Sequence, residues 1–219
     1  MGELRKDQKI KFLTNTLANN PNEEAGAMKK QEKIDLLRKG ISERTICRCY
    51  FTYDRNYFYY YPNAVNATFF LGQEEDDFLL DGYCIRKLSH LKKVEIKDDK
   101  CNEINRMFGI ADQIKDPGID ITSWQTIFLS LSHLDAYIQI EDAINEQFAI
   151  GMIEKVLKDR LCFKTFDADG VWDEQSTEIR FSQITSVQWG TRYAQYWKRY
   201  LERKQDDCAS LGAHTGSHL

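Results

Sequence analysis

One order of predicted elements occurs twice along the chain: a short helix, five short strands and a second helix. Breaking residues are scarce, since only 3 of the 219 residues are proline and 12 are glycine, and this scarcity favours regular elements. Runs rich in β-branched and aromatic residues predict the strands, and apolar residues spaced three and four apart predict the helices. The repeated order restricts the fold to a pair of small, mostly β units.

The first copy of this order begins with a helix over 30–39, which ends at Gly40. Its predicted strands are 45–53, 57–61, 67–72, 82–88 and 91–96, and a helix capped by Asp98 or Asp99 follows. In the second copy, Ser123 caps the first helix. Its predicted strands are 136–141, 148–156, 161–166, 178–181 and 184–189, and the last helix is 191–204.

An offset of 93 residues aligns the two copies without a gap. Apolar residues then fall on apolar residues: Leu88, Leu91, Val94 and Ile96 align with Phe181, Ile184, Val187 and Trp189. Few positions are identical, so the shared spacing and the order of elements carry the inference. We therefore predict an internal duplication.

The predicted fold class is α+β, mostly β, with two five-stranded small barrels that are each flanked by short helices. Residues 1–29 form a leader that is partly helical or flexible, and translation starts at Met1 or at Met28. The first barrel domain is 30–108, the linker is 109–122, the second barrel domain is 123–204, and 205–219 form a flexible tail. Trp189 and Ile184 are expected in the second core, and Trp197 is expected to pack the last helix onto it.

Two segments of the second copy resemble the Sm-like fold, a small SH3-like barrel. The stretch FAIGMIEKV places Gly151 inside a strand, as in the bent second strand of that fold, where glycine permits close backbone approach. The stretch EIRFSQITSVQW, residues 178–189, resembles its last two strands. The resemblance covers 123–189 well and 30–96 loosely. It implies a tandem Sm-like layout, similar to small bacterial domains of no known activity.

Charge and hydropathy narrow the class of protein. The formal net charge is −4, so there is no overall attraction to phosphate backbones or anionic lipid. The longest apolar runs are far shorter than the ~20 residues that cross a bilayer, and no signal peptide is visible at the start of the sequence. Three of the six cysteines, Cys49, Cys84 and Cys162, lie in strand-like runs and are expected to be small buried hydrophobes. We predict a soluble, cytoplasmic protein without a membrane partner.

The densest sequence feature is Tyr57-Phe58-Tyr59-Tyr60-Tyr61. A strand sends alternate side chains to opposite faces, so at least two of these rings must leave the core. They form either a contact with a partner or another folded part, or a stacking platform for nucleotide bases. The candidate contact residues are Tyr57, Tyr59, Tyr60, Tyr61, Arg48 and Lys92.

Motifs for chemistry are weak. The acidic run near Gly170 has the wrong spacing for a calcium loop, and Cys47 with Cys49 lacks the second pair that structural zinc requires. We predict no catalytic residue, cofactor or metal. The predicted function is a non-catalytic interaction or adaptor protein that binds a protein partner or itself. The first alternative is a nucleic-acid-binding Sm-like protein. A further alternative is a hydrolase whose acidic residues meet between the barrels; those residues are Asp76, Asp77, Asp169 and Asp173.

Overall fold

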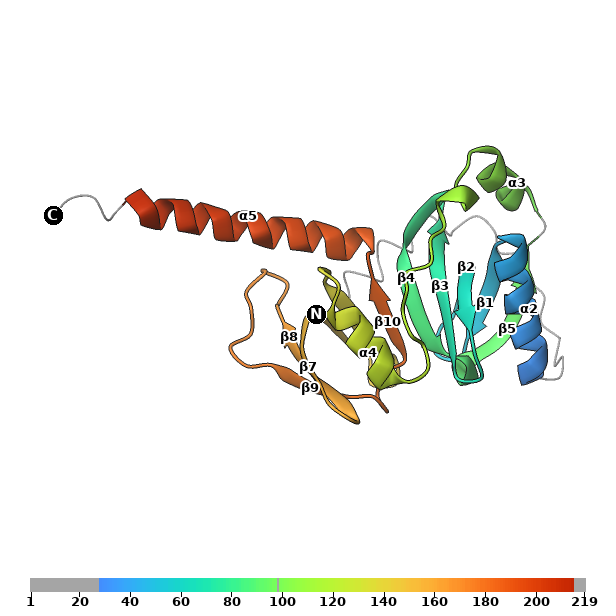
Figure 1. Ribbon diagram of the computed structural model, residues 1–219, viewed down its shortest axis with the longest axis horizontal. Coiled ribbons are helices and arrows are strands. Elements are labelled where there is room, and N and C mark those ends of the chain that lie inside the picture. Colours follow the sequence, from blue (N-terminus) through green and yellow to red (C-terminus); the bar gives the residue numbers. More distant parts are fainter. Residues whose placement is uncertain (1–27, 98, 215–219) are drawn as a thin grey trace.

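The computed structural model describes residues 28–97 and 99–214, with side chains up to residue 204 (Figure 1). In the first half the elements are α2 (Lys30–Glu43), β1 (Cys47–Phe51), β2 (Tyr57–Val65), β3 (Phe69–Asp76), β4 (Leu79–Lys87), η1 (Leu88–His90), β5 (Leu91–Ile96), α3 (Lys100–Met107) and η2 (Ala111–Gln113). In the second half they are α4 (Trp124–Ser132), β6 (Ile138–Asp142), β7 (Gln147–Val156), β8 (Arg160–Thr165), β9 (Thr177–Arg180), β10 (Ser186–Trp189) and α5 (Arg192–His214). Each strand and helix predicted for the two copies therefore corresponds to an element of the structure.

The ten strands form one open antiparallel sheet, in the order β5-β1-β2-β3-β4-β10-β6-β7-β8-β9. The prediction of two separate five-stranded barrels was wrong. The physical reason is the pairing of β4 with β10, in which Ile85 lies opposite Val187 and Tyr83 opposite Trp189. Strands β4 and β10 would each have been an edge of a separate unit, but they are hydrogen-bonded to one another and join the two halves.

The hydrophobic core also crosses this joint. Phe69, Leu71 and Ile85 of the first half belong to the same buried cluster as the core of the second half. The Phe69 and Trp124 rings meet edge to face, with their centroids 4.8 Å apart. A second cluster, which includes Leu37 of α2, lies within the first half. Burial of apolar surface at the joint therefore adds to the strand pairing.

The two halves of the sheet repeat one strand order. It is β5-β1-β2-β3-β4 in the first half and β10-β6-β7-β8-β9 in the second. An internal duplication requires the same order in both halves, and different orders would have excluded it. The duplication itself stays a prediction.

Several local expectations are confirmed by the structure. A Cβ added to Gly151 would lie 1.8 Å from the backbone oxygen of Lys164, so the close backbone approach expected there exists. Ser123 caps α4, and the Asp99 carboxylate accepts hydrogen bonds from the first turn of α3. Ile184 and Trp189 are buried in the core of the second half.

Helix α5 leaves the sheet and projects from the body of the molecule (Figure 1). It continues to His214, so its end lies inside the tail predicted for 205–219. Trp197 packs the start of α5 onto the second half, 5.1 Å from the Phe166 ring, as expected. Residues 1–27 of the predicted leader lie outside the described residues. No helix in the described ranges has both the length and the hydrophobicity needed to cross a membrane.

Candidate functional site

The aromatic run of β2 divides between the two faces of the sheet, as the period of a strand requires. Phe58 and Tyr60 face the core of the first half, where Tyr60 is fully buried. The Tyr60 ring lies 5.4 Å from Phe70 and 6.3 Å from Phe51. Tyr60 is therefore a core residue and not a contact for a partner.

Tyr57 and Tyr59 lie on the opposite face and gather around Arg48 of β1. The Arg48 guanidinium lies 4.3 Å from the centroid of the Tyr57 ring and donates a 3.0 Å hydrogen bond to the Tyr59 hydroxyl. Tyr57 keeps 40% of its surface exposed. Stacking of a guanidinium on an aromatic ring holds both in place at the surface. Three of the six predicted contact residues therefore come together.

Three further residues, which were not among the predicted contact residues, complete this surface. The Tyr50 hydroxyl donates to Glu95 at 3.0 Å, and Glu95 also pairs with Arg48 at 3.5 Å and with Lys93 at 2.8 Å. The strand registers bring these residues together, since Arg48 lies opposite both Tyr59 and Glu95. We call Arg48, Tyr50, Tyr57, Tyr59, Lys93 and Glu95 the aromatic face.

Charge and partial burial act together on the aromatic face. Burial alone would raise the pKa of Glu95, but hydrogen bonds from Lys93 and Tyr50 and the charge of Arg48 hold that pKa below its ordinary value. Burial raises the pKa of the Tyr59 hydroxyl. The lowered pKa of Glu95 favours its charged form, and the raised pKa of Tyr59 favours its neutral phenol.

The other two predicted contact residues are placed elsewhere. Tyr61 is buried with Ile46 and Ala111, because the segment containing α3 and η2 covers the outer face of the sheet at this point. Lys92 is exposed on β5 at an irregularity in the pairing with β1. Its neighbour Lys93, 5.6 Å from the Tyr50 ring centroid, is the lysine that joins the aromatic face.

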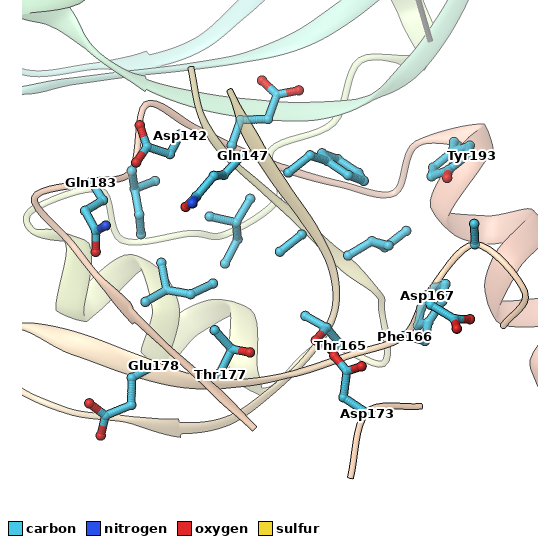
Figure 2. A pocket seen from close by; sticks show the side chains of 18 residues that line it. Asp142, Gln147, Thr165, Phe166, Asp167, Asp173, Thr177, Glu178, Gln183 and Tyr193 are labelled. Carbon is cyan, nitrogen blue, oxygen red and sulfur yellow. Dashed lines mark hydrogen bonds between the residues drawn. The ribbon is translucent and has the colours of Figure 1, made fainter. Parts of the chain in front are cut away.

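A groove of about 660 Å³, which was not among the predicted sites, opens in the second half (Figure 2). Its sides come from the end of β6, the start of β7, the end of β8 and strand β9. Ile140, Ile150 and Ile184 contribute apolar side chains that are otherwise buried. Labelled polar side chains lie around the margin in Figure 2, with all-carbon side chains between them.

The carboxylates of the hydrolase hypothesis are not brought together in this groove. Of its four residues, only Asp173 lines the groove, and it accepts a hydrogen bond from Thr165. Asp76 instead pairs with Arg192 at 3.2 Å. No group of three or more His, Cys, Asp or Glu residues among those described is placed to hold a metal ion.

The buried cysteines are unreactive. Cys47 and Cys49 on β1 and Cys84 on β4 are fully enclosed, while Cys162 is only partly buried. Burial raises the pKa of the Cys47 thiol to about 12 and also raises the pKa of Cys49 and Cys84. Because the thiolate is the reactive form, these thiols are unreactive at neutral pH.

Comparisons of the chain with protein-family models, with curated proteins and with solved structures gave no match.

Proposed function

We propose that this chain is a non-catalytic interaction protein that binds a protein partner through the aromatic face. The observation that supports it is the arrangement of Arg48 between two tyrosines on an open sheet face, with Tyr57 40% exposed. Tyrosine and arginine are enriched where protein interfaces concentrate their binding energy. A tyrosine ring also buries apolar area while its hydroxyl keeps a polar partner.

The ion pairs of the aromatic face favour a protein partner over nucleic acid. Arg48 and Lys93 both pair with Glu95, at 3.5 and 2.8 Å. A phosphate would have to displace this carboxylate or lie beside it, and like charges repel at such distances. Nucleic-acid binding, the first alternative, therefore lacks a basic track on this face.

The aromatic face is separate from the contact between the two halves of the chain. The two halves are joined at β4 and β10, whereas the aromatic face lies on β1, β2 and β5. The exposed Tyr57 ring and the half-buried Tyr59 ring are thus available to another protein or to a second copy of this chain. Interfaces of this kind have an aromatic centre and a charged margin.

The test is a double substitution, Tyr57→Ser with Tyr59→Ser, expressed beside the parent chain in the source cells. A partner that co-purifies with the parent is expected to be lost with the variant. The purified partner is expected to bind the parent with at least tenfold higher affinity than it binds the variant. Size-exclusion mass and solution scattering on the purified proteins measure self-association in the same experiment.

The matched control replaces exposed tyrosines elsewhere, Tyr196→Ser with Tyr200→Ser on α5, which are 68% and 50% exposed. This control is expected to keep the partner. Circular dichroism should report a folded double variant, because Tyr57 is 40% exposed and Tyr59 is only partly buried against the cluster of Tyr61, and an exposed cation–π contact contributes only about 0.5–1 kcal/mol. If the Tyr57 and Tyr59 variant retains every partner and the parent's mass and shape, the proposal is wrong.

A further inference from the structure

Strand β9 is the last strand of the sheet and borders the groove of the second half. One edge of β9 pairs with β8, with Leu161 opposite Ile179 and Cys162 opposite Glu178. Its other edge pairs with no strand in the described parts of the chain. Thr177, Glu178 and Ile179 of β9 all line the groove. Unpaired backbone groups at a sheet edge are a template for a further strand.

The floor of the groove is apolar and belongs to the core. Ile184 is fully buried, and Ile140 and Ile150 are 3% and 6% exposed. Proteins often protect a free edge by making the strand short and charged. Strand β9 is itself short and carries Glu178 and Arg180. The groove beside it also exposes apolar surface, since Phe148 is 40% and Tyr193 is 42% exposed, so a segment added to β9 would bury hydrophobic surface as well as pair its backbone.

The margin of the groove is acidic. Glu141, Asp142, Asp167, Asp173 and Glu178 line it, and the described side chains of the lining include no lysine, arginine or histidine. Glu178 pairs with Arg160, which lies outside the lining, at 3.2 Å. Asp142 accepts hydrogen bonds from the backbone of Ile144 and Asn145 and forms no ion pair with a described lysine or arginine. Such a margin attracts cationic groups and repels anionic ones.

We infer that this groove binds an extended segment of another protein that alternates apolar and basic residues, by adding it as a strand to β9. Strand addition gives affinity through backbone hydrogen bonds, and pockets for alternate side chains give selectivity. One row of side chains would pack against the exposed apolar side chains of the groove, Phe148 and Tyr193. Lysine and arginine side chains are long enough to reach the carboxylates at the margin while their stems cover apolar surface.

This inference concerns a different site from the aromatic face and does not depend on it. The probe is a fluorescently labelled eight-residue peptide of alternating valine and lysine, titrated against the purified chain and followed by anisotropy. Two matched peptides accompany it: one has glutamate in place of lysine, and one is methylated at every backbone nitrogen. The expected result is saturable binding of the first peptide alone, weakening as salt is raised.

The protein variant is Glu178→Lys, and its control is Glu103→Lys on α3. Both side chains are exposed and both pair with a neighbouring cation, Glu178 with Arg160 and Glu103 with Lys100. Glu178→Lys is expected to weaken peptide binding about fivefold or more, because reversing a charge turns an attraction into a repulsion, and Glu103→Lys is expected to leave it unchanged. The Tyr57→Ser and Tyr59→Ser variant should bind the peptide like the parent, which separates this result from that for the aromatic face.

Three outcomes would overturn the inference. Equal binding of the methylated peptide would exclude strand addition, since methylation removes the backbone donors. Equal binding of the glutamate peptide would exclude charge selection. A dimer of the parent that Glu178→Lys dissociates, with no peptide present, would show that a second copy of this chain fills the groove instead.

Discussion

Replacement of Ile85 by alanine tests whether the two halves fold as one body. Ile85 lies on β4, between Leu71 of β3 and Val187 of β10, and is fully buried. It belongs to the cluster that also contains the core of the second half. A substitution in the first half should therefore destabilise the second half as well.

The expected size of the effect follows from burial. Truncation of a fully buried isoleucine to alanine costs about 2–5 kcal/mol, through lost transfer energy and a cavity. We take about 3 kcal/mol, because three strands meet at Ile85 and cannot all close over the space. For a domain of this length, 1 kcal/mol lowers the melting temperature by about 2–4 °C. The expected decrease is therefore about 6–12 °C.

The assay uses the placement of the tryptophans. All 4 tryptophans of the chain, Trp124, Trp172, Trp189 and Trp197, lie in the second half. Trp172 and Trp197 have ring contacts within that half, whereas Trp124 meets Phe69 across the joint, so their fluorescence during heating or urea titration reports mainly on the second half. The measured quantity is the midpoint of the unfolding transition and not the fluorescence intensity. Trp189 stacks on Tyr83 across the joint, with the ring centroids 5.3 Å apart, so a local change at the joint can alter the intensity of Trp189 without unfolding the second half.

The control is Leu79→Ala on the same strand, where the side chain is 51% exposed and the loss should stay below about 0.5 kcal/mol. If Ile85→Ala leaves the tryptophan midpoint unchanged while circular dichroism shows an unfolded first half, the halves are independent. The continuous core would then not couple them, and our account of the joint would be refuted.

Three other substitutions probe single features. Gly151→Ala places a Cβ 1.8 Å from the Lys164 backbone oxygen, so we expect a loss of about 3 kcal/mol or more in urea unfolding; a loss below 1 kcal/mol would contradict the close approach. Trp197→Ala should cost about 2 kcal/mol, less than the 3–5 kcal/mol of a fully buried tryptophan, because Trp197 is only partly covered; a much larger loss would mean that α5 is central to the core. Burial raises the pKa of Glu75 above its ordinary 4.5, so its contribution to stability is largest below that value and is lost as pH rises through the raised pKa. Glu75→Gln should remove this decline from the pH dependence of unfolding, and an unchanged pH profile would exclude Glu75 as its source.

Local patterns were enough to predict the elements. The alternation of apolar and polar residues predicted that Ile184 and Trp189 lie in the core and that Gln188 does not. The side chain of Ser123 predicted the start of α4. Both signals depend only on residues close in sequence. Gly151 was predictable for the same reason, since a glycine inside a strand signals a neighbouring backbone.

The joint between the halves could not be predicted from these patterns. Alternation shows which face of β4 or β10 is buried, but an inner strand and an edge strand have the same alternation. Tyr61 illustrates a related limit. Its ring leaves the core of the first half, yet it is buried, because α3 and η2 return over that part of the sheet. Both features depend on contacts between residues far apart in sequence.

The candidate site was predicted in part. Tyr57, Tyr59 and Arg48 follow from the aromatic run and from the basic residue on the strand before it. Glu95 and Lys93 were missed as members, because only the register between β1 and β5 brings them to the same face. A signal for the groove existed in the shorter predicted run at 178–181, which corresponds to β9.

Strands β4 and β9 differ in length and in what lies along their second edge. The two strands hold the same place in the repeated order, but β4 has 9 residues and β9 has 4. The longer β4 pairs with β3 on one edge and with β10 on the other. The shorter β9 pairs with β8 on one edge, and its other edge pairs with no strand in the described parts of the chain. The edge of β4 that pairs with β10 therefore corresponds to the unpaired edge of β9. We infer that a strand from another protein pairs with β9 in the place that β10 takes beside β4.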